Sequence, residues 1–288
     1  MFYTVTAFSD NIQGGNLAGV VLNAADYTCK EMLNLAKKYN FSEIAFLLES
    51  NFADFKIRYF TPLVEIAMCG HATVAAFNLL RDLKIIKAAT YTLETQASLL
   101  KIIVTNKEIF MEQNLPEYSY LIKSEDIKGC FQGDIDYLVD DLPIQIVSTG
   151  LRDIILPVKD YARLVELKPN FNVIKRISEQ FDVVGIHAFS LITDGKEDIQ
   201  ARNFAPLYGI EEEAATGTAS GALASYLKKY LKDQFKNQFI IKQGSNLKRP
   251  SQIKVKLKTT EGSITKLFVG GKAFLVSQES IRSDYLGR

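Results

Sequence analysis

The sequence repeats its own order of motifs, and this repeat constrains the fold more than any other feature. The first half carries Ala45-Phe46, then Arg58-x-Phe60-x-Pro62, then Gly70-His71-Ala72, and the second half carries Ala188-Phe189, then Arg202-x-Phe204-x-Pro206, then Gly217-Thr218-Ala219. The spacing drifts only from 143 (188 − 45) to 147 (217 − 70) residues, as short loop insertions would produce. A repeat of this length is a domain rather than a solenoid element. We therefore expect two similar domains that face each other around a pseudo-twofold axis.

Hydrophobic periodicity predicts an α+β fold in which short strands outnumber helices. A helix is expected from about Cys29 to Tyr39, where Thr28 and Glu31 have the spacing of a capping box. The segments that begin at Gly70 and Gly217 are rich in small and apolar residues almost all round, which predicts a buried central helix in each half.

The stretch from Leu115 to Leu142 is more polar than its surroundings and carries an acidic group at residues 134–141. We place the domain junction in this stretch. The expected domains are residues 1–115, completed by the C-terminal segment 275–288, and residues 116–274.

The composition favours a small-molecule partner. With 34 basic and 33 acidic residues the formal net charge is +1, so no overall field favours nucleic acid or an anionic membrane surface. No stretch approaches the roughly 18 apolar residues of a membrane span, and the start lacks the pattern of a signal peptide. Three cysteines without metal-ligand spacing fit a reducing compartment, so we expect a cytoplasmic protein without structural zinc.

The two glycine-led helices are candidate anion sites. A helix that opens with glycine presents free backbone N–H groups and the positive end of the helix dipole without a side chain in the way. Gly70 and Gly217 could together grip a carboxylate or an oxyanion. The alternative is that these glycines only allow close packing.

Glu43 is the candidate for proton transfer. It lies in the otherwise apolar segment FSEIAFLL, where burial is expected to raise the pKa of its carboxyl group toward neutrality. Aligning Ala45 with Ala188 places Ile186 opposite Glu43, so the carboxylate is expected in one half only. The alternative is a solvated position on a half-buried strand.

Other candidates lie beside the helix starts. The helix dipole disfavours the protonated form of His71, so its imidazole is expected to be neutral, or it is simply a local helix-start residue. Cys69 precedes Gly70, where a helix N-terminus lowers a thiol pKa, although buried cysteines are commonly inert. Glu213 ends an acidic run that the dipole would favour without any function.

Several motifs resemble, in order, those of the phenazine-biosynthesis PhzF-like family, whose fold is related to diaminopimelate epimerase. They are GNLAGVVL at residues 15–22, SEIAF at 42–46, RYFTPLVEIAMCGHAT at 58–73, STG at 148–150, RNFAPLYGIEEEAATGTASGA at 202–222 and VGGKAFLV at 269–276. The resemblance covers essentially the whole chain.

The resemblance implies, in each domain, a curled, mostly antiparallel, barrel-like sheet around a central helix, and an active site in the cleft between the domains. It also implies catalysis without metal or cofactor, and a homodimer. By the motifs, Glu43 is the catalytic residue, and substrate-binding or supporting roles fall to Gly70, His71, Glu213, Gly217 and Thr218. Ser42, Cys69 and Asn16 lie in the same motifs and are further candidates.

The sequence departs from the family pattern in the second half. Glu213 stands for an aspartate, Ala214 for a proline and Thr218 for a serine, and Leu17 replaces the proline of GNPAG. The related epimerases place a cysteine before each central helix, whereas this chain has Cys69 but Thr216. A mechanism with two thiols is therefore excluded.

We expect a cofactor-independent isomerase that shifts a proton on a small carboxylic acid, similar to trans-2,3-dihydro-3-hydroxyanthranilate isomerase. Glu43 would remove an acidic C–H proton while the helix N-termini hold the resulting anion. The first alternative is an epimerase or racemase that uses Glu43 with a single partner such as Cys69. The second is a catalytically silent small-molecule binder with the same fold.

Overall fold

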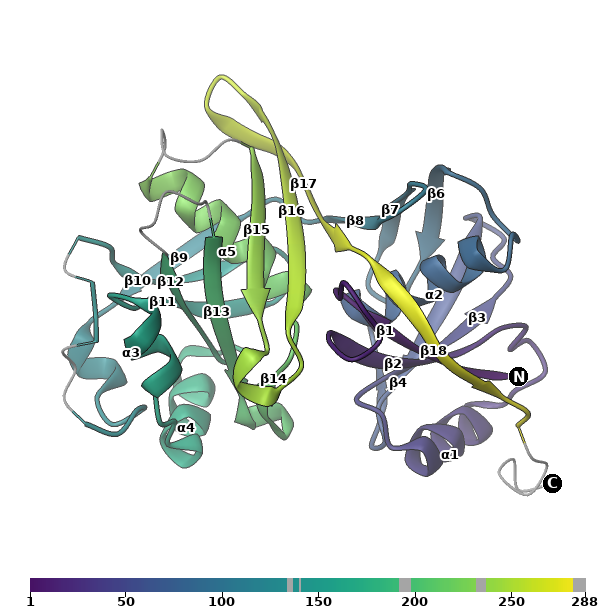
Figure 1. Cartoon of the computed structure of the whole chain (residues 1–288), viewed down its shortest axis with the longest axis horizontal. Coiled ribbons are helices and arrows are strands. Elements are labelled where there is room, and N and C mark those ends of the chain that lie inside the picture. Colours follow the sequence, from purple (N-terminus) through teal and green to yellow (C-terminus); the bar gives the residue numbers. More distant parts are fainter. Residues whose placement is uncertain (134–136, 140, 192–197, 232–236, 282–288) are drawn as a thin grey trace. The chain divides into compact units, whose positions relative to one another are not determined.

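The computed structural model describes residues 1–133, 137–139, 141–191, 198–231 and 237–281 (Figure 1). The chain divides into two compact units. The first comprises Met1–Glu112 together with the segment that begins at Gly270, and the second comprises Gln113–Val269. Part of the acidic group expected at residues 134–141, and the end of the expected C-terminal segment 275–288, lie outside the described residues. None of the described helices is long and apolar enough to cross a membrane.

The first unit is built on a mixed sheet. Its strands are β1 (Phe2–Ala7), β2 (Asn16–Val21), β3 (Ile44–Leu48), β4 (Phe55–Phe60), β5 (Glu65–Ile66), β6 (Ala89–Glu94), β7 (Leu99–Val104), β8 (Ile109–Gln113) and β18 (Ala273–Glu279). The pairs β18–β1, β1–β2, β3–β4, β4–β5, β6–β7 and β7–β8 are antiparallel, whereas β2–β3 and β4–β6 are parallel. In Figure 1 the yellow strand β18 lies beside the purple β1, so the first and last strands pair in this sheet.

Two helices cover the two faces of this sheet. Helix α2 (Gly70–Asp82) is buried along nearly its whole length and packs against β1, β2, β3, β7 and β18, so the sheet curls around it without closing. Helix α1 (Cys29–Tyr39) packs on the other face and has the predicted capping box, in which Thr28 and Glu31 bond each other's backbone N–H. Both helices begin where the sequence predicts.

The second unit has the same construction. Its strands are β9 (Glu117–Ile122), β10 (Ile144–Ser148), β11 (Arg152–Pro157), β12 (Ile186–Leu191), β13 (Asp198–Ala205), β14 (Ile210–Glu213), β15 (Gln238–Gln243), β16 (Ser251–Thr260) and β17 (Ser263–Gly271). Its helices are α3 (Tyr161–Glu166), α4 (Phe171–Phe181) and the central α5 (Gly217–Tyr230), with short 3₁₀ turns η1 (Ser124–Ile127), η2 (Pro206–Tyr208) and η3 (Ser245–Leu247). Helix α5 is buried and packs against β10, β11 and β16.

The order of strand pairing is the same in both units, which confirms the internal duplication. The antiparallel pair β10–β11, the parallel pair β11–β12, the antiparallel pair β12–β13 and the parallel pair β13–β15 follow one another as β1–β2, β2–β3, β3–β4 and β4–β6 do. The fold class is therefore the predicted one, a sheet-rich α+β architecture with two repeats.

The strand registers correct the predicted partner of Glu43. Ile44 pairs with Phe60 and Gly19, while Ile186 pairs with Phe204 and Ile154, so Ile186 corresponds to Ile44. The mirror residue of Glu43 is therefore Gly185, and the expectation of Ile186 was wrong by one position. An equivalent hydrogen bond is present at both positions. The carbonyl of Glu43 accepts from the backbone N–H of Gly19, and the carbonyl of Gly185 accepts from that of Ile154.

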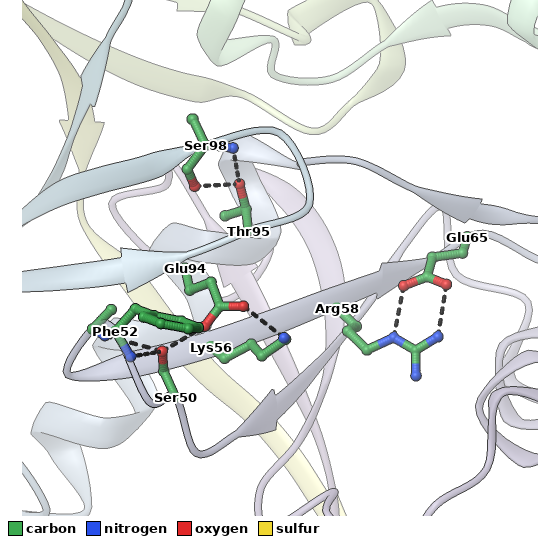
Figure 2. Close-up of polar contacts among 9 residues, drawn as sticks. Ser50, Phe52, Lys56, Arg58, Glu65, Glu94, Thr95 and Ser98 are labelled. Carbon is green, nitrogen blue, oxygen red and sulfur yellow. Dashed lines mark hydrogen bonds and ion pairs between the residues drawn. The ribbon is translucent and has the colours of Figure 1, made fainter.

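The repeated arginines form the same ion pair in both units. Arg58 donates two parallel hydrogen bonds, each 2.7 Å long, to the carboxylate of Glu65. Figure 2 shows the arrangement of the two side chains. Arg202 binds Glu212 in the same way at 2.9 and 2.8 Å. These pairs join the fourth and fifth strands of each repeat, β4 to β5 and β13 to β14, and so fix the chain just before each central helix.

Candidate active site

Glu43 lies immediately before β3, and its side chain is 12% exposed. Its carboxylate oxygen Oε2 lies 3.2 Å from Nε2 of His71, yet the two atoms are not aligned for a hydrogen bond. Among the described residues no other donor reaches this buried oxygen. This oxygen of Glu43 therefore makes no hydrogen bond with the described residues. A carboxylate oxygen in this state can accept a proton from a bound molecule.

His71 is the second residue of α2 and is almost completely buried. Burial lowers the pKa of its imidazole, and the attraction of Glu43 and a hydrogen bond to the carbonyl of Leu17 offset this only in part. The imidazole is therefore neutral near pH 7, as the sequence predicts.

Cys69 completes this group. Its Sγ lies 3.3 Å from Nδ1 of His71, and the Oγ of Ser42 lies 3.5 Å from Nε2. Glu43, Cys69 and His71 offer atoms of metal-ligand type within 4.8 Å of one another. However, the thiol and the carboxylate approach opposite nitrogens of one ring, so they form a chain of polar contacts rather than a set that converges on one point.

Both central helices begin without a side-chain cap. Cys69 is the N-cap residue of α2 and Thr216 is the N-cap residue of α5, and neither side chain accepts a hydrogen bond from its helix. Gly70 and Gly217 follow them as the first helical residues, and both are partly exposed. The first N–H groups of each helix therefore lack the cap that serine or threonine usually provides, a state compatible with an anion as partner.

In the second unit, the Glu213 side chain is hydrogen-bonded to the N-cap residue of α5. The hydroxyl of Thr216 donates to Oε2 of Glu213 at 2.6 Å. Gln243, which the sequence analysis did not single out, donates to this hydroxyl and to the Glu213 carbonyl at 3.0 and 2.7 Å. The sequence indicates only that Gln243 is buried, because it follows Phe239 and Ile241 on the buried face of an alternating strand.

The remaining candidates lie near these two groups or within their elements. Thr218 is buried in the first turn of α5, and its carbonyl accepts a hydrogen bond from Thr149 of the STG motif. Asn16 is the first residue of β2, next to Leu17, whose carbonyl bonds His71. The first unit thus brings Glu43, His71, Cys69 and Ser42 together, and the second places Glu213, Gly217 and Thr218 around one helix start.

Comparison with known proteins agrees with this picture. The family model described as phenazine biosynthesis-like protein, PhzC-PhzF, matches residues 5–279. The chain is 31% identical to the uncharacterized isomerase YfhB of Bacillus subtilis, with 90% of each chain covered. It is also 31% identical to the uncharacterized isomerase YddE of Escherichia coli O157:H7, with 95% of each covered.

Solved structures show the same fold. A phenazine biosynthesis protein of the PhzF family from Bacillus anthracis superposes with a TM-score of 0.88 at 30% identity, covering 96% of both chains. A hydroxyproline epimerase from Agrobacterium vitis shares the fold at a TM-score of 0.64 and 12% identity, covering 96% of this chain and 88% of that one. On the match of the family model and of these relatives over nearly the whole length, the chain belongs to the PhzF family of phenazine biosynthesis-like proteins.

Proposed function

We propose that this protein is a small-molecule isomerase that shifts a proton on a carboxylic acid, with Glu43 as the base. The observation that carries the proposal is the Oε2 atom of Glu43, which is buried beside a neutral imidazole and has no aligned hydrogen-bond donor in the part of the chain that the structure describes. A carboxylate in this state can accept a proton from carbon without first breaking a strong hydrogen bond. The isomerase names of the full-length relatives support the reaction class.

In the proposed reaction, Glu43 removes an acidic C–H proton, and the same carboxylic acid returns it to another carbon of the substrate. The intermediate carries negative charge, which donors near the start of a central helix can stabilise. His71 holds its place through Cys69 and the Leu17 carbonyl and stays neutral, so it does not compensate the charge of Glu43. Glu213, Gly217 and Thr218 are proposed to bind or support the substrate. The reaction needs no cofactor in this scheme.

The test uses trans-2,3-dihydro-3-hydroxyanthranilate as probe, in deuterated water, with NMR detection of deuterium incorporation and of the position of the double bonds. Replacing Glu43 with Gln keeps the shape but removes the base, so we expect exchange to fall by about 10²- to 10⁴-fold. Glu49→Gln, an exposed position in the same segment, serves as the matched control and should behave as wild type. A fully active Glu43→Gln protein with native circular dichroism would overturn the assignment.

An epimerase is the second candidate, because hydroxyproline epimerase and proline racemase share the fold. Thr216 occupies the N-cap position in α5 that Cys69 occupies in α2, so a symmetric pair of thiols is absent. Deuterium incorporation at a stereocentre without movement of a double bond would identify this activity. Binding of the probe without any exchange would instead identify a silent binder.

A further inference from the structure

Gln243 is a buried amide whose hydrogen bonds all go to the turn that precedes α5. It is the last residue of β15 and is 1% exposed. Its Nε2 donates to the Glu213 carbonyl at 2.7 Å and to Oγ1 of Thr216 at 3.0 Å, while its Oε1 accepts from the backbone N–H of Thr216 at 3.2 Å. The side chain of Gln243 therefore forms hydrogen bonds with both ends of the turn from Glu213 to Thr216.

These bonds fix the direction of every proton in the group. The backbone N–H of Thr216 can only donate, so Oε1 of Gln243 must face it and Nε2 must face Thr216 Oγ1. Because Nε2 occupies a lone pair of that hydroxyl, the single hydroxyl proton is free to point at Oε2 of Glu213, 2.6 Å away. The amide of Gln243 thus fixes the direction in which the Thr216 hydroxyl donates, which is toward Oε2 of Glu213.

The Thr216 side chain does not cap its own helix. An N-cap threonine ordinarily accepts a hydrogen bond from the second or third helical N–H. The Thr216 hydroxyl makes no such bond, and its contacts with Gln243 and Glu213 account for where it points. The hydroxyl at the N-cap position of α5 is therefore directed at the Glu213 carboxylate.

The first unit shows that the fold itself does not require this amide. The strand registers place Thr95 at the position of Gln243, because Phe55 pairs with Leu93 as Ile199 pairs with Ile241. The Thr95 hydroxyl bonds Ser98 within its own turn, as Figure 2 shows. The position equivalent to Glu213 is also different, since counting back from the two helix starts reaches Ile66. The first unit therefore lacks both a carboxylate at the position of Glu213 and an amide at the position of Gln243.

We propose that Gln243 is a positioning residue that holds the Glu213 carboxylate in its working orientation through Thr216. The proposal rests on the proposed function, in which Glu213 supports the substrate. The relevant variants are Gln243→Met, which removes all three hydrogen bonds at similar volume, and Gln243→Glu, which keeps the acceptor for the Thr216 N–H but loses both donations when ionised. Gln252→Glu makes the same chemical change on the neighbouring strand β16 and is the control.

The kinetic test measures kcat/KM for the dihydro-hydroxyanthranilate probe as a function of pH. We expect Gln243→Met to lose about tenfold or more at every pH, because the Thr216 hydroxyl is then no longer held toward the Glu213 carboxylate. Gln243→Glu should lose as much at high pH and recover as the pH falls, since the protonated acid can again donate to Thr216. The control should follow the wild-type profile. Equal profiles for Gln243→Glu and wild type would overturn the proposal, because a packing role alone requires no proton.

A crystal structure of Gln243→Met separates this proposal from the proposed function. The contact between Thr216 Oγ1 and Glu213 Oε2 should be absent in the variant and present in the wild type. If the wild type does not act on the probe, the proposed function fails but the structural comparison still decides whether Gln243 orients Glu213. A Glu213 carboxylate that keeps its wild-type position in the variant would refute the role assigned to Gln243.

Discussion

Asp153 is a buried carboxyl group whose effect on stability should depend on pH. It lies in β11 and is 1% exposed. Its neighbours include Asn203, whose amide lies 3.2 Å from Nδ1 of the fully buried His187. Within the described residues, Oδ1 of Asp153 has no hydrogen-bond partner. Burial therefore raises the pKa of Asp153 from its ordinary value of 3.8 to about 7, and a hydrogen bond from Asn203 opposes this effect to a lesser extent.

The sign of the effect follows from the direction of this shift. Between pH 4 and pH 7 the unfolded chain releases the proton of Asp153 while the folded protein keeps it, so the contribution of this group to stability falls as the pH rises. The difference between the ordinary pKa of 3.8 and the pKa of about 7 in the folded protein corresponds to about 4 kcal/mol of folding stability. This contribution to stability is fully lost above pH 7. His187 acts in the opposite direction, because burial lowers its pKa from 6.5 to about 3 and stability falls as the pH decreases below 6.5.

Asp153→Asn isolates one of these opposing contributions. The variant should unfold at nearly the wild-type urea concentration at pH 4, and should be more stable than the wild type by up to about 4 kcal/mol at pH 8. Urea titrations followed by circular dichroism at several pH values measure the difference. Asp182→Asn, at a side chain that is 91% exposed, is the control and should change stability by less than about 0.5 kcal/mol at every pH. A constant difference between Asp153→Asn and wild type from pH 4 to pH 8 would refute the reasoning.

The structure makes two further predictions about stability. Gly185→Ala should destabilise the protein by several kcal/mol or abolish folding, because the new Cβ would lie 1.9 Å from the carbonyl oxygen of Phe204. Gly70→Ala, whose Cβ would meet only the end of a methionine side chain at 3.4 Å, should retain native melting behaviour, and equal melting temperatures for the two variants would contradict this explanation. Arg202→Met should cost about 3–5 kcal/mol in urea titrations, since it leaves a buried carboxylate and three backbone carbonyls without their donor. Lys56→Met, which breaks a more exposed pair, should cost less than about 1 kcal/mol, and a similar loss in both would show that burial does not set the effect.

The sequence predicts the helices better than the strand registers, for a physical reason. The capping box at Thr28 and the small-residue helices at Gly70 and Gly217 are local signals, and the structure confirms all three. A register depends on which face of a strand is buried, and neighbouring residues of a strand face opposite ways. Matching Ala45 with Ala188 aligned two such opposite residues, because Ala188 packs with Ile186 whereas Ala45 lies between Ile44 and Phe46.

Site residues with a charge or a motif could be named from the sequence, whereas their supporting groups could not. Glu43 and His71 stand in a recognisable motif, and the structure places their side chains 3.2 Å apart. Gln243 forms its hydrogen bonds with a turn 27 to 30 residues away in the sequence, so only the tertiary structure shows these partners. The buried Asp153 was missed for a similar reason, since a single carboxylate in an apolar strand gives no indication of what it contacts.

The two repeats share one fold but place their carboxylates at positions that are not equivalent. Glu43 corresponds to Gly185, where the backbone of Phe204 leaves no room for any side chain, and Glu213 corresponds to Ile66. An acid at the mirror position of Glu43 is therefore sterically excluded, and is not merely absent. A reaction that inverts a stereocentre with two equivalent bases would require an acid/base group at matching positions of both repeats. A proton shift needs only one carboxylate, which removes a proton from one carbon and returns it to another. The asymmetry within the duplicated fold thus favours isomerisation by Glu43 over symmetric racemisation.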